Sequence, residues 1–253
     1  MQLEEIGIQL RPRSAAEAVD LGRVMLLAWY GGAMRAWGIT YLAFGIPLLL
    51  VLWDYPTIAI LTVWWLKPVG DRALLFAFSR SLFGKPTSMR DVWRALPDLL
   101  RNTGLFFALT LGRFSLRRAL LLPVRQLEGQ RGRAARRRGR VLSSRVDNLA
   151  VGLTVFCATM SLALALSAIM LIQIMVPEGR EGIFRMDEWF GPGHGMPASV
   201  HFVINLTCMF AESIVEPFYM ASGFALYLNR RSELEGWDIE LAFRHLSSRK
   251  AEA

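Results

Sequence analysis

The sequence is poor in the residues that soluble enzymes and disulfide-bonded domains depend on. Only 20% of its 253 residues are charged, and it contains only three histidines and two cysteines. Both cysteines, Cys157 and Cys208, fall inside apolar runs, so we expect two small buried side chains rather than a bridge. The composition therefore excludes a disordered tail, a disulfide scaffold and an ordinary soluble enzyme.

Motifs for catalysis and metal binding are missing as well. The chain has no G-x-S-x-G, H-E-x-x-H, P-loop or Rossmann pattern and no zinc-type spacing. The first 20 residues lack an apolar h-region, so we expect no cleavable signal peptide. Asp187, Glu188 and His194 lie close in sequence, but the Gly191-Pro192-Gly193 turn explains that composition without chemistry. We predict a protein that is not an enzyme and binds no cofactor or metal.

Apolar residues are abundant and are gathered into long runs. They make up 53% of the chain, and the mean hydropathy is +0.34. The run 147–176 has no charge after Asp147, and at about 1.5 Å per residue it exceeds a hydrocarbon core of roughly 30 Å. The run 199–228 is equally long but carries Glu212 and Glu216. These runs predict a polytopic membrane protein.

A shorter pair of apolar runs comes earlier in the chain. Residues 38–53 and 57–66 flank Asp54-Tyr55-Pro56, which favours a tight hairpin of two spans. Because the second run is short, either two full crossings or a re-entrant hairpin over 38–66 fits the pattern. The expected fold is all-α, a polytopic helical membrane protein with about four transmembrane helices plus amphipathic interfacial helices. Indole rings favour the interfaces, where we place Trp37, Trp53, Trp64 and Trp65.

Positive charge is concentrated in one segment and predicts the orientation. Residues 113–145 contain 11 arginines against Glu128, a net +10, whereas 177–198 carries a net −2. The positive-inside rule therefore places the arginines in the cytoplasm, the loop 177–198 outside and both termini inside. We expect a bacterial cytoplasmic (inner) membrane protein.

The densest part of this segment is a run of arginines without interleaved aromatic residues. That pattern argues against nucleic acid and favours contact with anionic lipid on the cytoplasmic face, with an acidic protein as the alternative partner. The candidate lipid contacts are Arg131, Arg133, Arg136, Arg137, Arg138 and Arg140.

Two helix starts stand out between the apolar runs. Ser14 and Glu17 have the spacing of a capping box, which predicts a helix running to Gly31-Gly32. A second start signal lies at 86–91, and the helix after it has one apolar side. That side could lie in the headgroup plane or pack against the other spans. Its members are Val92, Trp93, Leu96, Leu99 and Leu100, opposite Arg90, Arg94 and Arg101.

These observations divide the chain into five regions. We expect an interfacial N-terminal helix, a transmembrane hairpin, a basic helical region on the cytoplasmic side, a pair of transmembrane helices with an external loop, and a cytoplasmic tail. Their bounds are 1–36, 37–66, 67–146, 147–228 and 229–253.

Glu212 and Glu216 form the sharpest candidate site. At i and i+4 they share a helix face, and a carboxylate inside a membrane needs a cavity, a cation or another helix. Pro217 adds a kink by freeing a backbone carbonyl. The pair therefore predicts either a proton or cation site or a buried ion pair that anchors helices.

The predicted partners of these carboxylates are Arg113 and Arg117. The stretch 104–124 is apolar on both sides of its arginines, and Arg113 and Arg117 are also spaced at i and i+4. If 104–124 enters the membrane, their guanidinium groups can reach Glu212 and Glu216. Contact with lipid phosphate is the competing interpretation.

The end of the last apolar run provides a resemblance. It reads Glu216-Pro217-Phe218-Tyr219, then FALYLNRR over 224–231, then ELEGWDIEL over 233–241. This resembles the end of uncharacterised bacterial proteins related to the glycerophosphodiester phosphodiesterase membrane-domain family. The resemblance implies an inner-membrane protein without the phosphodiesterase catalytic domain, accessory to an envelope or membrane complex.

Three functions follow in order of preference. We expect a non-catalytic membrane scaffold or accessory subunit that binds a protein partner or forms a homo-oligomer. The alternative is a small transporter or channel component that uses Glu212 and Glu216. A lipid-active enzyme comes third, because no convincing nucleophile or metal site lies near the headgroup plane.

Overall fold

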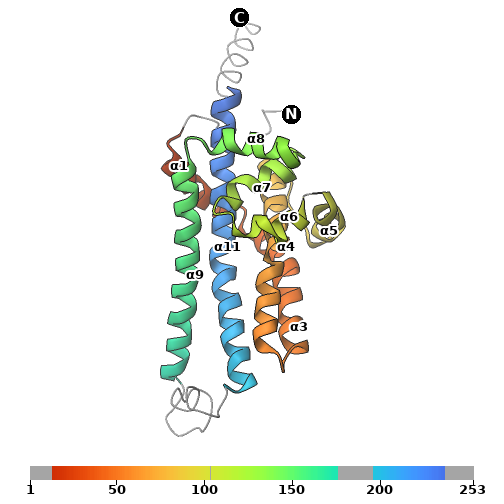
Figure 1. The fold of residues 1–253 in the computed structure, drawn as a ribbon, viewed down its shortest axis with the longest axis vertical. Helices are drawn as coiled ribbons and strands as arrows, with labels where there is room; N and C mark the ends of the chain where they lie inside the picture. The colour runs from red at the N-terminus through yellow and green to blue at the C-terminus, as the bar shows by residue number, and fades with distance from the viewer. Residues whose placement is uncertain (1–12, 103, 176–195, 237–253) are drawn as a thin grey trace, which may run out of the picture.

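A computed structural model of the chain describes residues 13–102, 104–175 and 196–236, and within these ranges all regular elements are helices (Figure 1). The expected all-α fold is confirmed. The elements are α1 (Ala15–Ala28), α2 (Tyr30–Trp37), the π-helix η2 (Gly38–Leu42), α3 (Ala43–Val51), α4 (Pro56–Leu82), α5 (Met89–Asn102), α6 (Leu105–Leu109), the 3₁₀ helix η3 (Leu111–Phe114), α7 (Arg118–Gln126), α8 (Gly132–Ser143), α9 (Asp147–Met175) and α11 (Ala198–Glu235).

Three stretches of the described chain are long and apolar enough to cross a membrane. The first is Tyr30–Val51, which α2, η2 and α3 form together. The second is α9, and the third is α11. Three such helices support a membrane location. Helix α4 is also long, but Lys67, Asp71 and Arg72 interrupt its apolar character and are buried inside the protein. The fourth span therefore stays a prediction.

The predicted hairpin is present. Helix α3 ends at Val51, and α4 begins at Pro56, where the proline lacks an N–H that the first helical turn would leave unpaired. Asn205 of α11 donates a 3.0 Å hydrogen bond to the Pro56 carbonyl, which ties the turn to the start of α11. In Figure 1 the turn lies toward the same end of the molecule as the end of α9.

Trp37 corrects one expectation about the interfaces. Its side chain is fully buried, is stacked on Tyr41 and donates its indole N–H to Ser213 Oγ at 2.9 Å. Gly70 of α4 makes room for it, because a Cβ at Gly70 would lie 2.6 Å from the ring. The hydrogen bond inside the protein removes the need for an interfacial position. Trp53, by contrast, is partly exposed at the hairpin turn.

The N-terminal capping box is confirmed. Ser14 Oγ accepts a hydrogen bond from the Glu17 N–H, and the Glu17 carboxylate accepts one from the Ser14 N–H. The helix ends at Ala28, however, and Gly31-Gly32 lies in the first turn of α2. Helix α1 packs along α11 so closely that a Cβ at Gly22 would collide with the Ser222 backbone.

The second predicted helix start is also confirmed, at α5. The Asp91 carboxylate accepts hydrogen bonds from the Ser88 N–H and hydroxyl, which lower the pKa of Asp91 below its ordinary value. Val92 is fully buried in a small cluster with Ala73 and Ala77 of α4. Packing against another helix, the alternative to a headgroup position, therefore applies to this face, while Trp93 is half exposed.

Helix α7 and its neighbours position the candidate site. Helices α5, α6, α7 and α8 gather beside one half of α11, whereas α9, α11 and the α3–α4 hairpin extend away from them (Figure 1). Arg13, the first described residue, exchanges hydrogen bonds with the side-chain amide of Asn229 near the end of α11. Both cysteines are free; Cys157 is buried, as expected, whereas Cys208 is only partly buried.

Candidate functional site

A cluster of buried charges lies where α4 meets α11. Lys67 Nζ contacts one carboxylate oxygen of Glu212 and lies 2.7 Å from Glu216 Oε2. The side chains of Lys67 and Glu216 are 5% and 3% exposed, and that of Glu212 is 22% exposed. The two predicted acids therefore share one buried lysine.

Helix α7 brings a second cation to the same acids. Arg118 Nη2 donates to Glu216 Oε1 at 2.9 Å, and its guanidinium lies over the Tyr219 ring. The Tyr219 hydroxyl accepts a hydrogen bond from the Ala119 N–H and is bonded to the Thr154 hydroxyl of α9. These contacts join α7, α9 and α11 around one carboxylate.

Two further residues complete the group. Asp71 lies one helical turn after Lys67, beside Glu216. Arg113 of η3 donates to the Trp64 carbonyl, stacks on the Trp64 ring and lines a small cavity together with Asp71 and Arg118. The charge cluster, as we call it below, thus contains three cations and three acids and is formally neutral. Its members are Lys67, Asp71, Arg113, Arg118, Glu212 and Glu216.

The predicted pairing with Arg113 and Arg117 needs correction. Arg117 forms its ion pair with Asp147 at the start of α9, with Nη2 2.6 Å from Oδ2. Arg118 pairs with Glu216 instead. The prediction assumed one continuous helix through these arginines, but η3 ends at Phe114 and α7 begins at Arg118. That break places Arg117 on a different side from the one an i, i+4 spacing would give.

Sequence reasoning missed Lys67 and Asp71. The signal was available, because Lys67 and Asp71 have the same i, i+4 spacing as the two glutamates and therefore also share one helix face. Unlike the glutamates, they combine a positive charge with a negative one. The prediction instead began a cytoplasmic region at residue 67. In the structure α4 continues without a break past that point, so its first charged turn is carried into the core.

The arginine run of α8 divides into groups with different surroundings. Arg138 holds Glu128 with a bidentate contact at 2.9 and 3.2 Å and also reaches Glu235 of α11 at 2.5 Å. These carboxylates raise the pKa of Arg138 above its ordinary value. Arg138 was expected to contact lipid, but its guanidinium instead forms ion pairs with Glu128 and Glu235, and the second of these connects α8 to α11. Arg131, Arg133 and Arg137 are exposed.

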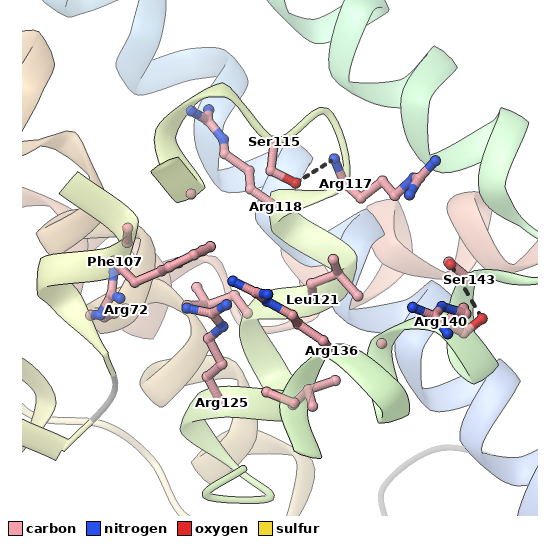
Figure 2. A pocket seen from close by; sticks show the side chains of 16 residues that line it. Arg72, Phe107, Ser115, Arg117, Arg118, Leu121, Arg125, Arg136, Arg140 and Ser143 are labelled. Carbon is pink, nitrogen blue, oxygen red and sulfur yellow. Dashed lines mark hydrogen bonds between the residues drawn. The ribbon is translucent and has the colours of Figure 1, made fainter. Parts of the chain in front are cut away.

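Arg136 and Arg140 line a cavity of about 340 Å³ together with residues of α4, α6, η3 and α7 (Figure 2). It contains six arginines and no acidic side chain. A second cavity, of about 30 Å³, reaches Asp71 and shares Arg72, Gly112 and Arg118 with the first. Basic side chains therefore surround an open space directly beside the charge cluster.

No family model, curated protein or solved structure matches this chain. The resemblance of 216–241 to the glycerophosphodiester phosphodiesterase membrane-domain family therefore stays a prediction.

Asp187, Glu188 and His194 lie outside the described residues, as does most of the predicted external loop. Within the described ranges, no group of three or more His, Cys, Asp or Glu side chains is arranged to hold a metal ion.

Proposed function

We propose that this chain is a non-catalytic scaffold or accessory subunit of a complex in the bacterial inner membrane. The observation that carries the proposal is the charge cluster, in which Glu212 and Glu216 are held by cations of the same chain. Removing one member of such a buried pair is strongly destabilising, so the cluster holds α4, α7 and α11 in one arrangement. A protein that presents a fixed surface to a partner benefits from such a lock.

The apolar surface supports a position of the cluster at the cytoplasmic edge of the membrane. Helix α9 exposes apolar side chains from Val155 to Met175, a rise of about 31 Å, which is one hydrocarbon thickness. Thr154, at the start of that stretch, is bonded to Tyr219 beside the cluster. The arginines of α7 and α8 lie at the same end of the apolar stretch of α9 as the charge cluster, as the positive-inside rule requires for cytoplasmic residues.

The hairpin fits the same placement. Ile58, Leu61 and Trp65 of α4 are exposed, whereas the helix is mostly buried from Lys67 to Phe78. The first half of α4 therefore faces lipid and the second half faces protein. From Pro56 to Lys67 the helix rises about 16 Å, about half of the hydrocarbon thickness, so in this arrangement the hairpin enters the membrane from the cytoplasmic side as a re-entrant hairpin, and both chain termini are cytoplasmic.

The face available to a partner is the long apolar surface of α9. This helix packs against α11 and α7 and leaves much of its length uncovered by the described residues. Phe156, Met160 and Leu166 are among its exposed side chains. Transmembrane helices of a partner or of a second copy can pack on such a surface, where lipid otherwise lies.

The proposal is tested by the composition of the purified protein. The tagged full-length chain is extracted from native membranes in a mild detergent, and its mass is measured by native mass spectrometry. A fixed stoichiometry with a partner or a second copy supports the scaffold. A lone protomer contradicts the proposal, provided that the protein is folded with its charge cluster intact. Unfolding measurements on the parent and on Lys67→Met check this, because the substitution destabilises only a protein in which the cluster is formed.

A transporter or channel component is the second candidate, and the small cavity favours it. A volume of about 30 Å³ is enough for one water molecule, and it lies beside Asp71, whose Oδ1 has no hydrogen-bond partner among the described residues. Because this cavity adjoins the larger one, water from the basic cavity has a route toward the buried acids. Proton flux through the protein in liposomes would support this function if the Glu216→Gln substitution abolishes it.

A further inference from the structure

The cavity of about 340 Å³ is lined by positive charge from three helices and the link before α7. Arg72 comes from α4, Arg117 precedes α7, and the others come from α7 and α8. No Asp or Glu lines the space. The six arginines are Arg72, Arg117, Arg118, Arg125, Arg136 and Arg140 (Figure 2).

Three of these arginines have other duties. Arg117 pairs with Asp147, Arg118 pairs with Glu216, and Arg72 donates to the Pro68 carbonyl. Among the described residues, no carboxylate forms an ion pair with any of the remaining three. These are Arg125, Arg136 and Arg140.

Arg125 and Arg136 approach each other across the cavity. Figure 2 shows their side chains extending from α7 and α8 toward the same point, with the Phe107 ring beside them. Burial, together with the charge of Arg136, lowers the pKa of Arg125 below its ordinary value. Two guanidinium groups that face each other without an acid between them repel, and an anion placed between them removes that repulsion.

Apart from Ser115 and Ser143, the rest of the wall is apolar. Phe107 lies under the Arg125 guanidinium, 3.7 Å from the ring centroid, and Leu121, Leu122 and Val124 line the same space. The volume falls within the range of small-molecule sites, and charged groups set against an apolar wall suit an amphiphilic anion. Guanidinium groups bind phosphate oxygens through paired hydrogen bonds, so phosphate is the anion that this arrangement fits best.

We propose that this cavity binds a phosphate group, with Arg125 and Arg136 as its ligands. The proposal does not depend on the scaffold function, because it concerns a different set of residues and a different ligand. The sequence predicted only that the arginine run contacts anionic lipid at the surface. The present proposal places the phosphate inside one defined cavity. The phosphate belongs either to a lipid headgroup or to a soluble molecule, and the experiment separates these sources.

The test uses the full-length chain in maltoside micelles, which contain no phosphate, at 150 mM salt, where surface charges are largely screened. Two probes are titrated by calorimetry, inorganic phosphate and short-chain phosphatidic acid. The pocket variant is Arg125→Gln with Arg136→Gln. The matched control is Arg133→Gln with Arg137→Gln, which removes the same charge from exposed positions of α8.

We expect one saturable site per chain, weakened about 10-fold or more in the pocket variant and less than about 3-fold in the control. Binding of phosphatidic acid alone assigns the phosphate to a lipid, and equal binding of inorganic phosphate assigns it to a soluble ligand. If the double variant unfolds, Arg136→Gln alone is used, since that side chain is exposed, with Arg136→Lys restoring part of the affinity. Absence of binding by both probes, or equal weakening in pocket and control variants, overturns the proposal.

Discussion

Replacing Lys67 by methionine tests the charge cluster directly. Among the described residues, Lys67 is the one cation that contacts both Glu212 and Glu216. Methionine has nearly the same length and fills the same space, so the change removes charge and leaves packing largely intact. The cluster then carries three acids against two cations.

The expected loss of stability follows from burial. The side chains of Lys67 and Glu216 are 5% and 3% exposed, so water cannot replace the missing partner. Breaking a buried ion pair by removing one member costs about 3–5 kcal/mol. A second change, Glu212→Gln, restores the balance and leaves the pair between Arg118 and Glu216 in place. Because replacing both members of a buried pair is close to neutral, the double variant should recover most of the loss.

Unfolding in mixed micelles, followed by circular dichroism, measures these differences. For a chain of this size the loss corresponds to a fall of about 6–20 °C in the thermal midpoint, at about 2–4 °C per kcal/mol. Lys85→Met is the matched control, because Lys85 is exposed and the same substitution there should have little effect. A double variant no more stable than Lys67→Met alone would refute the electrostatic explanation.

Three further predictions concern packing, a buried hydrogen bond and pH. Gly22→Ala should cost about 1–3 kcal/mol in unfolding experiments, because its Cβ meets the α11 backbone, whereas Gly152→Ala, with open space around it, should be neutral or slightly stabilising. Trp37→Phe should cost about 2–4 kcal/mol by the same measurement, since it removes the hydrogen bond to Ser213 and leaves a void beside Gly70. Asp91 has a pKa below its ordinary value in the folded protein, so its contribution is present at neutral pH and is lost as the pH falls through that lowered pKa. Amide exchange at the start of α5 should therefore approach that of Asp91→Asn on acidification, and a constant difference between the two proteins would contradict this.

Local signals accounted for much of the fold. The capping boxes at Ser14 and Ser88, the hairpin turn before Pro56 and the apolar runs of α9 and α11 depend on neighbouring residues. Such features can be read from the sequence because the physical cause and its effect lie within a few positions.

Long-range contacts were harder to predict. Glu212 and Glu216 were identified because charge inside an apolar run is costly wherever the partner lies. Their partners depend on how α4 and α7 pack on α11, and the break in the chain between η3 and α7 exchanged Arg117 for Arg118. Trp37 was misplaced for the same reason, since its hydrogen bond to Ser213 and the space beside Gly70 come from other helices.

Ion flux is the measurement that tests most directly whether the charge cluster holds the helices together or carries ions. Full-length protein and its Glu216→Gln variant are reconstituted into liposomes at equal density, and proton flux is followed with a pH-sensitive dye under an imposed potential. If the charge cluster holds the helices together, both proteins leave the proton flux at the level of protein-free liposomes, and the variant is less stable than the parent. Flux through the parent that disappears in a correctly folded Glu216→Gln variant would contradict it.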